Sequence, residues 1–337
     1  MSVLRLRGIS PYAIMATGGY DHTIRMWGLE SGMCTRIFRH EDCQVNCLAI
    51  SPNRRLIISG GFECIRIYDV NQTLDSALLT NNKVEKNVLA VGIEEEGKWM
   101  YTAGEDNTVR LYDLRALNMK CQKVFQTDAT VNCACLHPSQ KMMAVGDQKG
   151  IIHLWDLKSD HSKQLVPEPG ASIQSIAMDP NGKYMAAVTN RGRCFIWELP
   201  AMFVEELTLI QHRAMIEAHQ RYALRCKFSP DSKLLITSSA DQTARLWKMG
   251  EYEFFRELKR ENQKWVWDVG FTADSKYVVT VSSDCLARLW KVENGVIMRE
   301  YGGHEKAITA VAVSDSLTVP PGTPSTSFFT LSDIESP

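Results

Sequence analysis

Three stretches of the chain carry residue types that could bind a ligand or perform chemistry. The first is Gly92-Ile-Glu-Glu-Glu-Gly97-Lys98, whose glycine and lysine spacing matches that of a phosphate-binding loop. Trp99 follows it, where such a loop needs serine or threonine to bind Mg²⁺, and the three glutamates would repel phosphate. The surrounding pattern is strand, turn, strand rather than strand, loop, helix. We therefore expect a turn here and no nucleotide site.

The second candidate is a set of possible metal ligands, Cys133, Cys135 and His137, which alternate along one predicted strand and could share a face. Two thiolates and an imidazole would suit zinc. His137-Pro138, however, occupies a turn position that Ser-Pro pairs hold elsewhere in the chain, and no fourth ligand is apparent. Core packing explains these residues better, so we expect no metal and no cofactor.

The third candidate is a recurring set of His, Asp and Thr side chains that could be mistaken for a hydrolase triad. Each copy suits a chain of hydrogen bonds from a Trp indole N–H to a Thr hydroxyl, a His ring and an Asp carboxylate. The two copies are His219, Thr237, Asp241 and Trp247, and Thr17, Asp21, Trp27 and His304. Because the set recurs at a fixed period, we interpret it as a buried structural network rather than a catalytic one.

An aromatic residue that closes a predicted strand recurs every 41 to 50 residues. These residues are Trp27, Tyr68, Tyr112, Trp155, Trp197, Trp247 and Trp290. The spacing is the period of a β-propeller blade, and apolar–polar alternation before each aromatic predicts strands. The sequence therefore predicts an all-β fold, a seven-bladed WD-repeat β-propeller over residues 1–313.

The polar pattern is not the same in every blade. Blades one, three, six and seven have Thr ten residues, and Asp six residues, before the closing aromatic. Blade two keeps a loop histidine, His40, but has Phe62 at the Asp position, and blades four and five have Lys149 and Arg191 there. We expect those three blades to rely on packing.

The two ends of the chain predict how the ring closes. One strand fits before Trp27, over residues 12–18, and a last strand over residues 307–313 has nothing after it in its blade. We expect this strand to complete the first blade, because pairing the two ends removes exposed sheet edges. The segment 199–218 is longer than its counterparts and predicts an extended outer hairpin or surface loop. Residues 314–337, rich in Ser, Thr and Pro, predict a disordered tail.

The composition is that of a globular protein, with 45% apolar and 23% charged residues and a net charge of −1 among 337 residues. No positive excess favours nucleic acid or an anionic membrane, and no apolar run predicts a membrane span. The N-terminus lacks the apolar segment of a secretory signal. We therefore expect the ten cysteines to be buried, reduced thiols in a cytosolic protein.

The start of each inner strand of a propeller lies at one rim of the central channel. Trp265 and Trp267 fall at this rim and share a face by two-residue alternation. Polar and aromatic residues of other blades fall beside them, a composition typical of a protein-binding hot spot. The candidate partner-binding residues are Gln44, Asn46, Tyr222, Trp265 and Trp267. The alternative is that the tryptophans pack into the channel wall.

Several motifs resemble one family over about residues 14–314. They include Gly19-Tyr20-Asp21-His22-Thr23-Ile24-Arg25-Met26-Trp27, Gln164-Leu165-Val166-Pro167-Glu168-Pro169, Arg221-Tyr222-Ala223-Leu224, Trp265-Val266-Trp267 and Arg299-Glu300-Tyr301-Gly302-Gly303-His304. The chain resembles the Lethal-with-Sec-Thirteen family, the small WD-repeat subunits of the TOR kinase complexes, also called G-protein β-subunit-like proteins. The Pro-Glu-Pro segment and the Trp-x-Trp pair are unusual among WD repeats.

The resemblance implies a non-enzymatic scaffold that docks on an insertion in the C-lobe of the TOR kinase domain. It would stabilise that lobe and support TOR signalling in growth and nutrient response. It also implies a cytoplasmic location, with a fraction at lysosomal membranes through the TOR complex. The alternatives are another WD-repeat adaptor, such as a G-protein-like or ubiquitin-ligase subunit, and a propeller enzyme or metal protein. An enzyme would need convergent acid, base or ligand groups on the rim, which the sequence does not predict.

Overall fold

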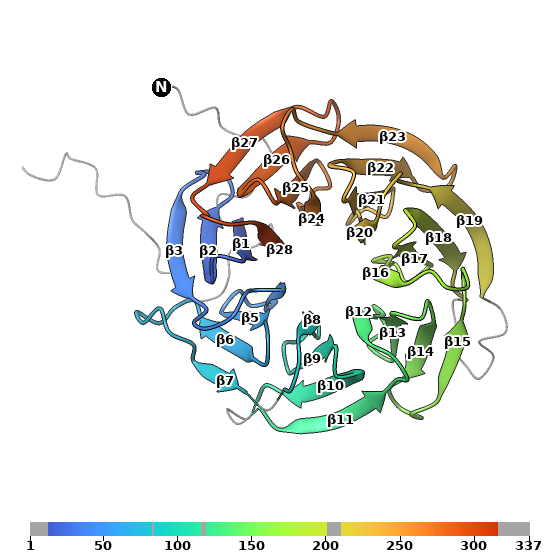
Figure 1. The fold of residues 1–337 in the computed structure, drawn as a ribbon, viewed down its shortest axis with the longest axis horizontal. Coiled ribbons are helices and arrows are strands. Elements are labelled where there is room, and N and C mark those ends of the chain that lie inside the picture. Colours follow the sequence, from blue (N-terminus) through green and yellow to red (C-terminus); the bar gives the residue numbers. More distant parts are fainter. Residues whose placement is uncertain (1–12, 83, 116–118, 201–209, 316–337) are drawn as a thin grey trace, which may run out of the picture.

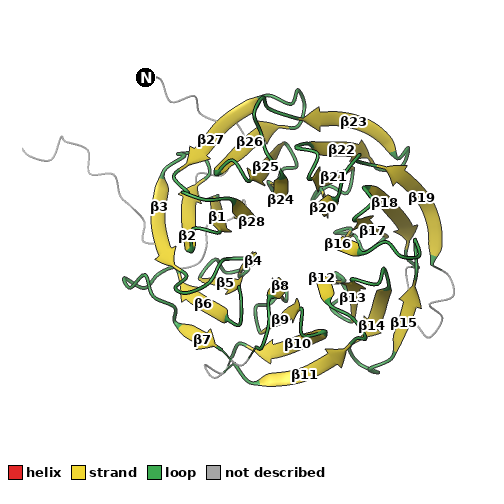
Figure 2. Cartoon of the chain, viewed as in Figure 1, coloured by secondary structure: helices red, strands yellow, loops and turns green. Residues whose placement is uncertain are grey.

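The computed structural model describes residues 13–82, 84–115, 119–200 and 210–315. Within these residues the chain forms seven four-stranded antiparallel sheets arranged as a ring around a central channel (Figure 1). Figure 2 shows strands and loops, and no helix, in the part of the chain that the structure describes. The predicted seven-bladed all-β propeller is confirmed.

Each blade runs outward from the channel in four strands. The innermost strands are β28 (Ile308–Ser314), β4 (Cys47–Ile50), β8 (Val88–Ile93), β12 (Val131–Leu136), β16 (Ile173–Met178), β20 (Ala223–Phe228) and β24 (Val266–Phe271). The second strands are β1 (Ile14–Gly19), β5 (Leu56–Gly60), β9 (Trp99–Gly104), β13 (Met142–Asp147), β17 (Tyr184–Thr189), β21 (Leu234–Ser239) and β25 (Tyr277–Ser282).

The third strands carry the closing aromatics, and the fourth strands form the outer wall. The third strands are β2 (Thr23–Gly28), β6 (Ile65–Asp69), β10 (Thr108–Asp113), β14 (Ile152–Asp156), β18 (Arg193–Glu198), β22 (Ala244–Lys248) and β26 (Leu286–Lys291). The fourth are β3 (Cys34–Arg39), β7 (Leu79–Asn81), β11 (Cys121–Gln126), β15 (Ser162–Leu165), β19 (Gln211–Glu217), β23 (Glu253–Leu258) and β27 (Ile297–Gly302).

The core lies between neighbouring blades. All six residues of β13 and of β25 are buried, whereas the outer strand β11 has four exposed and two half-buried residues. Second strands are buried because a neighbouring blade covers each of their faces, so both faces are apolar. One core cluster joins Ile236 and Leu246 of blade 6 to Val278 and Trp290 of blade 7. Packing between blades therefore holds the ring together.

The two ends of the described chain meet in blade 1. Strand β28 pairs antiparallel with β1, from Ile14 opposite Ser314 to Gly19 opposite Ile308. Figure 1 shows the C-terminal strand inside the N-terminal ones. This pairing confirms the predicted closure and leaves β1 with a neighbour on both edges. The tail predicted to be disordered lies, beyond Asp315, outside the described residues.

The long segment and the cysteines show where outer strands meet solvent. Within the long segment 199–218, the described part is a regular outer strand, β19, paired with β18. Cys34 and Cys121 are exposed, so the expectation of uniformly buried thiols is wrong for these two; both lie on outer strands, where one face meets solvent. All ten cysteines are free. None of the described segments forms a helix long and apolar enough to cross a membrane.

Candidate protein-binding rim

One end of the central channel opens into a cavity of ≈ 190 Å³ whose wall receives a residue from the start of every blade's inner strand. These residues are Asn46, Leu89, Asn132, Gln174, Leu224, Trp267 and Thr309. Tyr20, in the turn between β1 and β2, and Arg225 complete the wall. A second cavity of ≈ 320 Å³ follows along the channel and is lined by residues further along the same strands. The first cavity therefore marks the rim to which the sequence assigned the partner-binding residues.

The two rim tryptophans contact each other, with ring centroids 5.6 Å apart and planes inclined by 47°. The Trp267 indole N–H donates to Ser283 Oγ at 2.7 Å, and the Trp265 carbonyl oxygen accepts the Ser283 backbone N–H at 3.0 Å. Trp267 lines the cavity, whereas Trp265 remains 39% exposed. One tryptophan thus packs at the channel mouth and supports a second that presents its ring to solvent.

The candidate amides of blade 2 are held by a third amide. Gln44 Nε2 and Asn46 Nδ2 both donate to Asn87 Oδ1, each at 3.2 Å. Asn87 Nδ2 donates in turn to Glu105 Oε2 at 2.9 Å. These bonds order the rim across blades 2 and 3 before any partner arrives, which lowers the entropic cost of binding.

The structure does not gather all five candidates around one cavity. Asn46 and Trp267 lie in its wall, but Gln44, Tyr222 and Trp265 do not. Tyr222 is 56% exposed and precedes the inner strand of blade 6, next to the blade of the tryptophans. The rim therefore combines a narrow, partly polar cavity with aromatic side chains that lie outside it.

The first hydrogen-bond network lies where the ring closes. Trp27 Nε1 donates to Thr17 Oγ1 at 2.8 Å, and His304 lies between Thr17 Oγ1 (Nε2, 2.8 Å) and Asp21 Oδ2 (Nδ1, 2.7 Å). One tautomer satisfies all three contacts: Thr17 O–H donates to Nε2, and Nδ1–H donates to the carboxylate. Burial alone would raise the pKa of Asp21, but hydrogen bonds from His304 and Thr23 lower it to about 2.

The second network has the same geometry within blade 6. Trp247 Nε1 donates to Thr237 Oγ1 at 3.0 Å, and His219 contacts Thr237 Oγ1 at 2.8 Å and Asp241 Oδ2 at 2.9 Å. Burial opposes ionisation of Asp241, yet the His219 and Thr243 hydrogen bonds hold its pKa well below its usual range. Both sets lie among buried strand residues and tie a loop histidine to the second and third strands, so the geometry supports a structural role.

The other two candidate sites do not assemble. Gly92 and Ile93 end strand β8, and residues 94–98 form the hairpin turn to β9, in which Gly97 N–H donates to the Glu94 carbonyl. Cys133 and Cys135 line the larger cavity, but the His137 ring contacts Ser139 Oγ at 2.8 Å and Gly182 O at 3.2 Å instead.

Comparison with known proteins agrees with this architecture. The model of the family "WD domain, G-beta repeat" matches residues 32–69, 78–113, 119–156, 210–248 and 254–291. The Bos taurus protein named target of rapamycin complex subunit LST8 is 50% identical over 311 residues, covering 90% of this chain and 95% of that protein. The Drosophila melanogaster LST8 homolog is 47% identical over 305 residues, covering 90% and 97%. The Saccharomyces cerevisiae LST8 subunit is 36% identical over 303 residues, covering 90% and 99%.

The chain belongs to the LST8 family. The resemblance inferred from its motifs is confirmed, and it extends over the whole ring rather than over single repeats.

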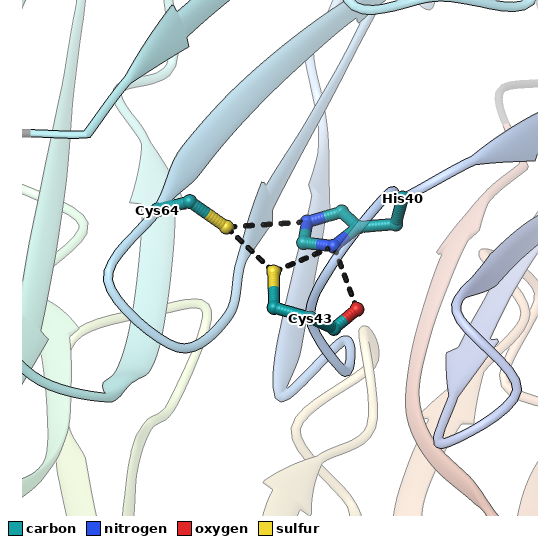
Figure 3. A group of neighbouring side chains, drawn as sticks. All are labelled: His40, Cys43 and Cys64. Atoms are coloured by element: carbon teal, nitrogen blue, oxygen red, sulfur yellow. Dashed lines mark hydrogen bonds between the residues drawn. The ribbon is translucent and has the colours of Figure 1, made fainter.

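Sequence reasoning missed one cluster in this LST8-family propeller. His40, Cys43 and Cys64 are buried and their ligand atoms lie within 4.8 Å of one another (Figure 3). His40 was noticed as a loop histidine without its aspartate, but the two cysteines that approach it are 21 residues apart on different loops. The five candidate contact residues did not include Tyr20 or Asn87, although the repeat spacing places Asn87 at the rim position that corresponds to Gln44. The repeat spacing that found Gln44 was signal enough for Asn87.

Proposed function

We propose that this chain is a non-catalytic scaffold subunit of TOR kinase complexes, which docks through the rim onto the C-lobe of the kinase domain. The observation that carries the proposal is similarity over 90% of the chain to proteins named as TOR complex subunits in cattle and fission yeast. The similarity spans the whole ring rather than a few repeats. Docking on a C-lobe insertion rests on the family resemblance.

The rim supplies the physical features that such docking needs. Trp265 offers a large apolar face, and its support by Trp267 means that little side-chain freedom is lost on binding. The amides Gln44 and Asn46, ordered through Asn87, provide hydrogen bonds beside it. Aromatic anchors with polar neighbours carry most of the energy in many interfaces. The subunit would act by binding energy alone, which holds the kinase lobe in its active arrangement.

As a TOR complex subunit the chain would reside in the cytoplasm, and a fraction would reach lysosomal membranes through the complex rather than through a membrane segment of its own. It would join the kinase first and contact other subunits of the complex through it.

The test is co-purification of TOR kinase with the wild-type chain and with a Trp265→Ala, Trp267→Ala variant. Loss of a single hot-spot residue costs about 2 kcal/mol or more, so we expect the double variant to bind at least about thirtyfold more weakly than the wild-type chain. The matched control is Met33→Ala, which removes a 69% exposed side chain in the turn between β2 and β3, at the opposite end of the strands. Thermal unfolding must show that both variants fold.

Each outcome separates part of the proposal. Loss of kinase in the tryptophan variant alone supports docking on this rim. Retained kinase in both variants would place the partner on another face. Recovery of Gγ-like or ubiquitin-ligase partners by the wild-type chain, and no kinase, would refute the TOR proposal itself.

A further inference from the structure

In blade 2 two thiols lie next to the loop histidine, on the ring nitrogens that meet an aspartate and a threonine in blades 1 and 6. His40 follows outer strand β3, as His304 follows β27 and His219 follows β19. Its Nδ1 lies 3.1 Å from Cys43 Sγ, and its Nε2 lies 4.0 Å from Cys64 Sγ (Figure 3). A contact that joins histidine to carboxylate in the other two blades thus joins histidine to sulfur here.

The two sulfurs almost touch. Cys43 Sγ and Cys64 Sγ are 2.7 Å apart, closer than two unbonded sulfur atoms ordinarily pack, although both cysteines are free. A disulfide bond of about 2.05 Å would need a further approach of only several tenths of an ångström. Cys43 lies in the segment between β3 and β4, and Cys64 lies in the turn between β5 and β6. Both belong to loops, which can absorb so small a movement.

A metal ion fits this cluster less well. With two Zn–S bonds of about 2.3 Å, sulfurs 2.7 Å apart would subtend only about 70° at the metal, far from tetrahedral. Cys43 lies next to Nδ1 of the His40 ring and Cys64 next to Nε2. No single ring nitrogen therefore lies close to both sulfurs, as a shared metal ion would require. Arg66 adds positive charge beside Cys43. A structural zinc site has four ligands, and the cluster offers three.

We propose that peroxide oxidises Cys43 and Cys64 to a reversible disulfide. This bond would link the rim segment of Gln44 and Asn46 to the β5–β6 turn. This modification site is independent of the proposed function, because it needs only the folded chain and an oxidant.

The chemistry follows from the contacts. Cys43 Sγ attacks one oxygen of hydrogen peroxide, the O–O bond breaks, and the leaving hydroxide becomes water by taking the proton that the Cys43 thiol has lost. The resulting sulfenic acid is then attacked by Cys64 Sγ, the S–O bond breaks, and the second hydroxide leaves with the Cys64 proton as water. Two thiols and one peroxide thus give one disulfide and two waters. A dithiol reductant reverses the linkage by thiol–disulfide exchange.

Cys43 is the attacking sulfur in this scheme. The hydrogen bond from Cys64 S–H lowers the pKa of Cys43, burial opposes this, and His40 and Arg66 lower the pKa further. The same hydrogen bond, together with burial, raises the pKa of Cys64. Because the thiolate is the nucleophile, this division makes Cys43 react first and leaves Cys64 to resolve the intermediate.

The linkage would strengthen contacts that already exist at the rim. Asn46 N–H donates to Gly60 O at 2.8 Å, and Gly61 leaves room for the cluster, since a Cβ there would lie 2.8 Å from Cys43 Sγ. A disulfide would add a covalent tie to this junction and would close a loop within the chain. We therefore expect the oxidised chain to unfold at a higher temperature than the reduced one.

The experiment treats the full chain, with Cys34→Ser and Cys121→Ser to remove the exposed thiols, with hydrogen peroxide under native conditions. The chain is then unfolded in denaturant with N-ethylmaleimide to block every free thiol, digested with trypsin and analysed by mass spectrometry. Cleavage after Arg39, Arg54, Arg55 and Arg66 releases Cys43 and Cys64 on separate peptides. Fragmentation distinguishes Cys43 from Cys47, which shares its peptide.

We expect a linked pair of these peptides through Cys43 and Cys64 that disappears after dithiothreitol, with Cys47 blocked by maleimide. The matched variant Cys64→Ser should yield no such pair and should accumulate over-oxidised Cys43. If peroxide treatment leaves both Cys43 and Cys64 free, so that maleimide blocks them both, the proposal is overturned. One equivalent of zinc in the untreated chain that is lost in Cys64→Ser would also overturn it, because the thiols would then be metal ligands.

Discussion

Removing the hydrogen bond between His304 and Asp21 tests whether the ring-closing network stabilises the fold. The bond joins a residue just before β28 to the turn after β1, so it connects the two ends of the described chain across 2.7 Å. Both side chains are almost fully buried, with 0% and 5% of their surface exposed. The bond is therefore largely shielded from solvent in the folded chain.

Two arguments give its magnitude. A hydrogen bond to a charged group contributes about 1.5–3 kcal/mol. Independently, the pKa of Asp21 falls from 3.8 to about 2, which corresponds to about 2 kcal/mol favouring the ionised, folded form. Thr23 and Glu305 also donate to this carboxylate, so His304 supplies part of that sum. A coupling energy of about 1–2 kcal/mol follows.

The assay is a double-mutant cycle in urea with the wild-type chain, His304→Ala, Asp21→Ala and the double variant. Each single variant should lose about 2–4 kcal/mol of unfolding free energy, because each leaves buried partners unsatisfied. The double variant should lose about 1–2 kcal/mol less than the sum of the single losses. As a control, the exposed pair Arg115 and Asp113 should show no resolvable coupling. Additive losses at His304 and Asp21, within a few tenths of a kcal/mol, would refute the reasoning.

Acid titration provides a second measure of the same bond. The pKa of Asp21 is lower in the folded chain than in the unfolded one, so the unfolded chain takes up the proton first as pH falls. The stabilisation is fully present above about pH 4 and is lost as pH falls toward about 2. Asp21→Ala should therefore flatten the dependence of unfolding free energy on pH in this window. An unchanged slope would show that Asp21 has its ordinary pKa in the folded chain.

Two further predictions concern closure and the indole contacts. A chain that ends at Gly303 lacks β28 and should have a much lower melting temperature than one that ends at Asp315. The reason is that Ile308 and Val311, only 0% and 2% exposed, stabilise the fold by about 1.5–3 kcal/mol each. Equal melting temperatures would contradict ring closure. Thr280→Val removes the acceptor that lies 2.8 Å from the Trp290 indole nitrogen and should cost about 1–3 kcal/mol in chemical unfolding; an unchanged unfolding free energy would contradict a stabilising role for this bond.

The fold could be predicted because its signals are local and repeated. The closing aromatics recur at the blade period, and hairpin pairing places each of them next to the second strand of its blade. Trp27, for example, pairs with Met15 of β1 and donates its indole N–H to Thr17 of the same strand. Hairpin pairing follows from neighbouring sequence, so a single repeat specifies it. The pairing of β28 with β1 joins residues distant in sequence, but it followed from counting the predicted strands. Blade 1 was one strand short of four, and the strand over residues 307–313 had no other blade to join.

The rim was predicted only in outline, because its details depend on contacts between blades and loops. Alternation placed Trp265 and Trp267 on one face, but it could not show that Ser283 binds the Trp267 indole while Trp265 remains exposed. Likewise, the rim position of Gln44 followed from spacing, whereas its contact with Asn87 depends on how blade 2 packs against blade 3. Such contacts are set by side-chain conformation, which periodicity does not determine.

Blade 2 shows how one repeat position can change from structural to reactive. Without an aspartate, Phe62 turns outward, 46% exposed, and His40 loses its carboxylate partner. The closing aromatic Tyr68 donates instead to the Arg39 carbonyl at 3.0 Å and packs 5.1 Å from Phe38, which replaces the network's contribution to holding the loop. The blade thus does not depend on a carboxylate that accepts a hydrogen bond from His40. The two thiols can occupy the histidine site and react while the surrounding packing keeps the blade intact.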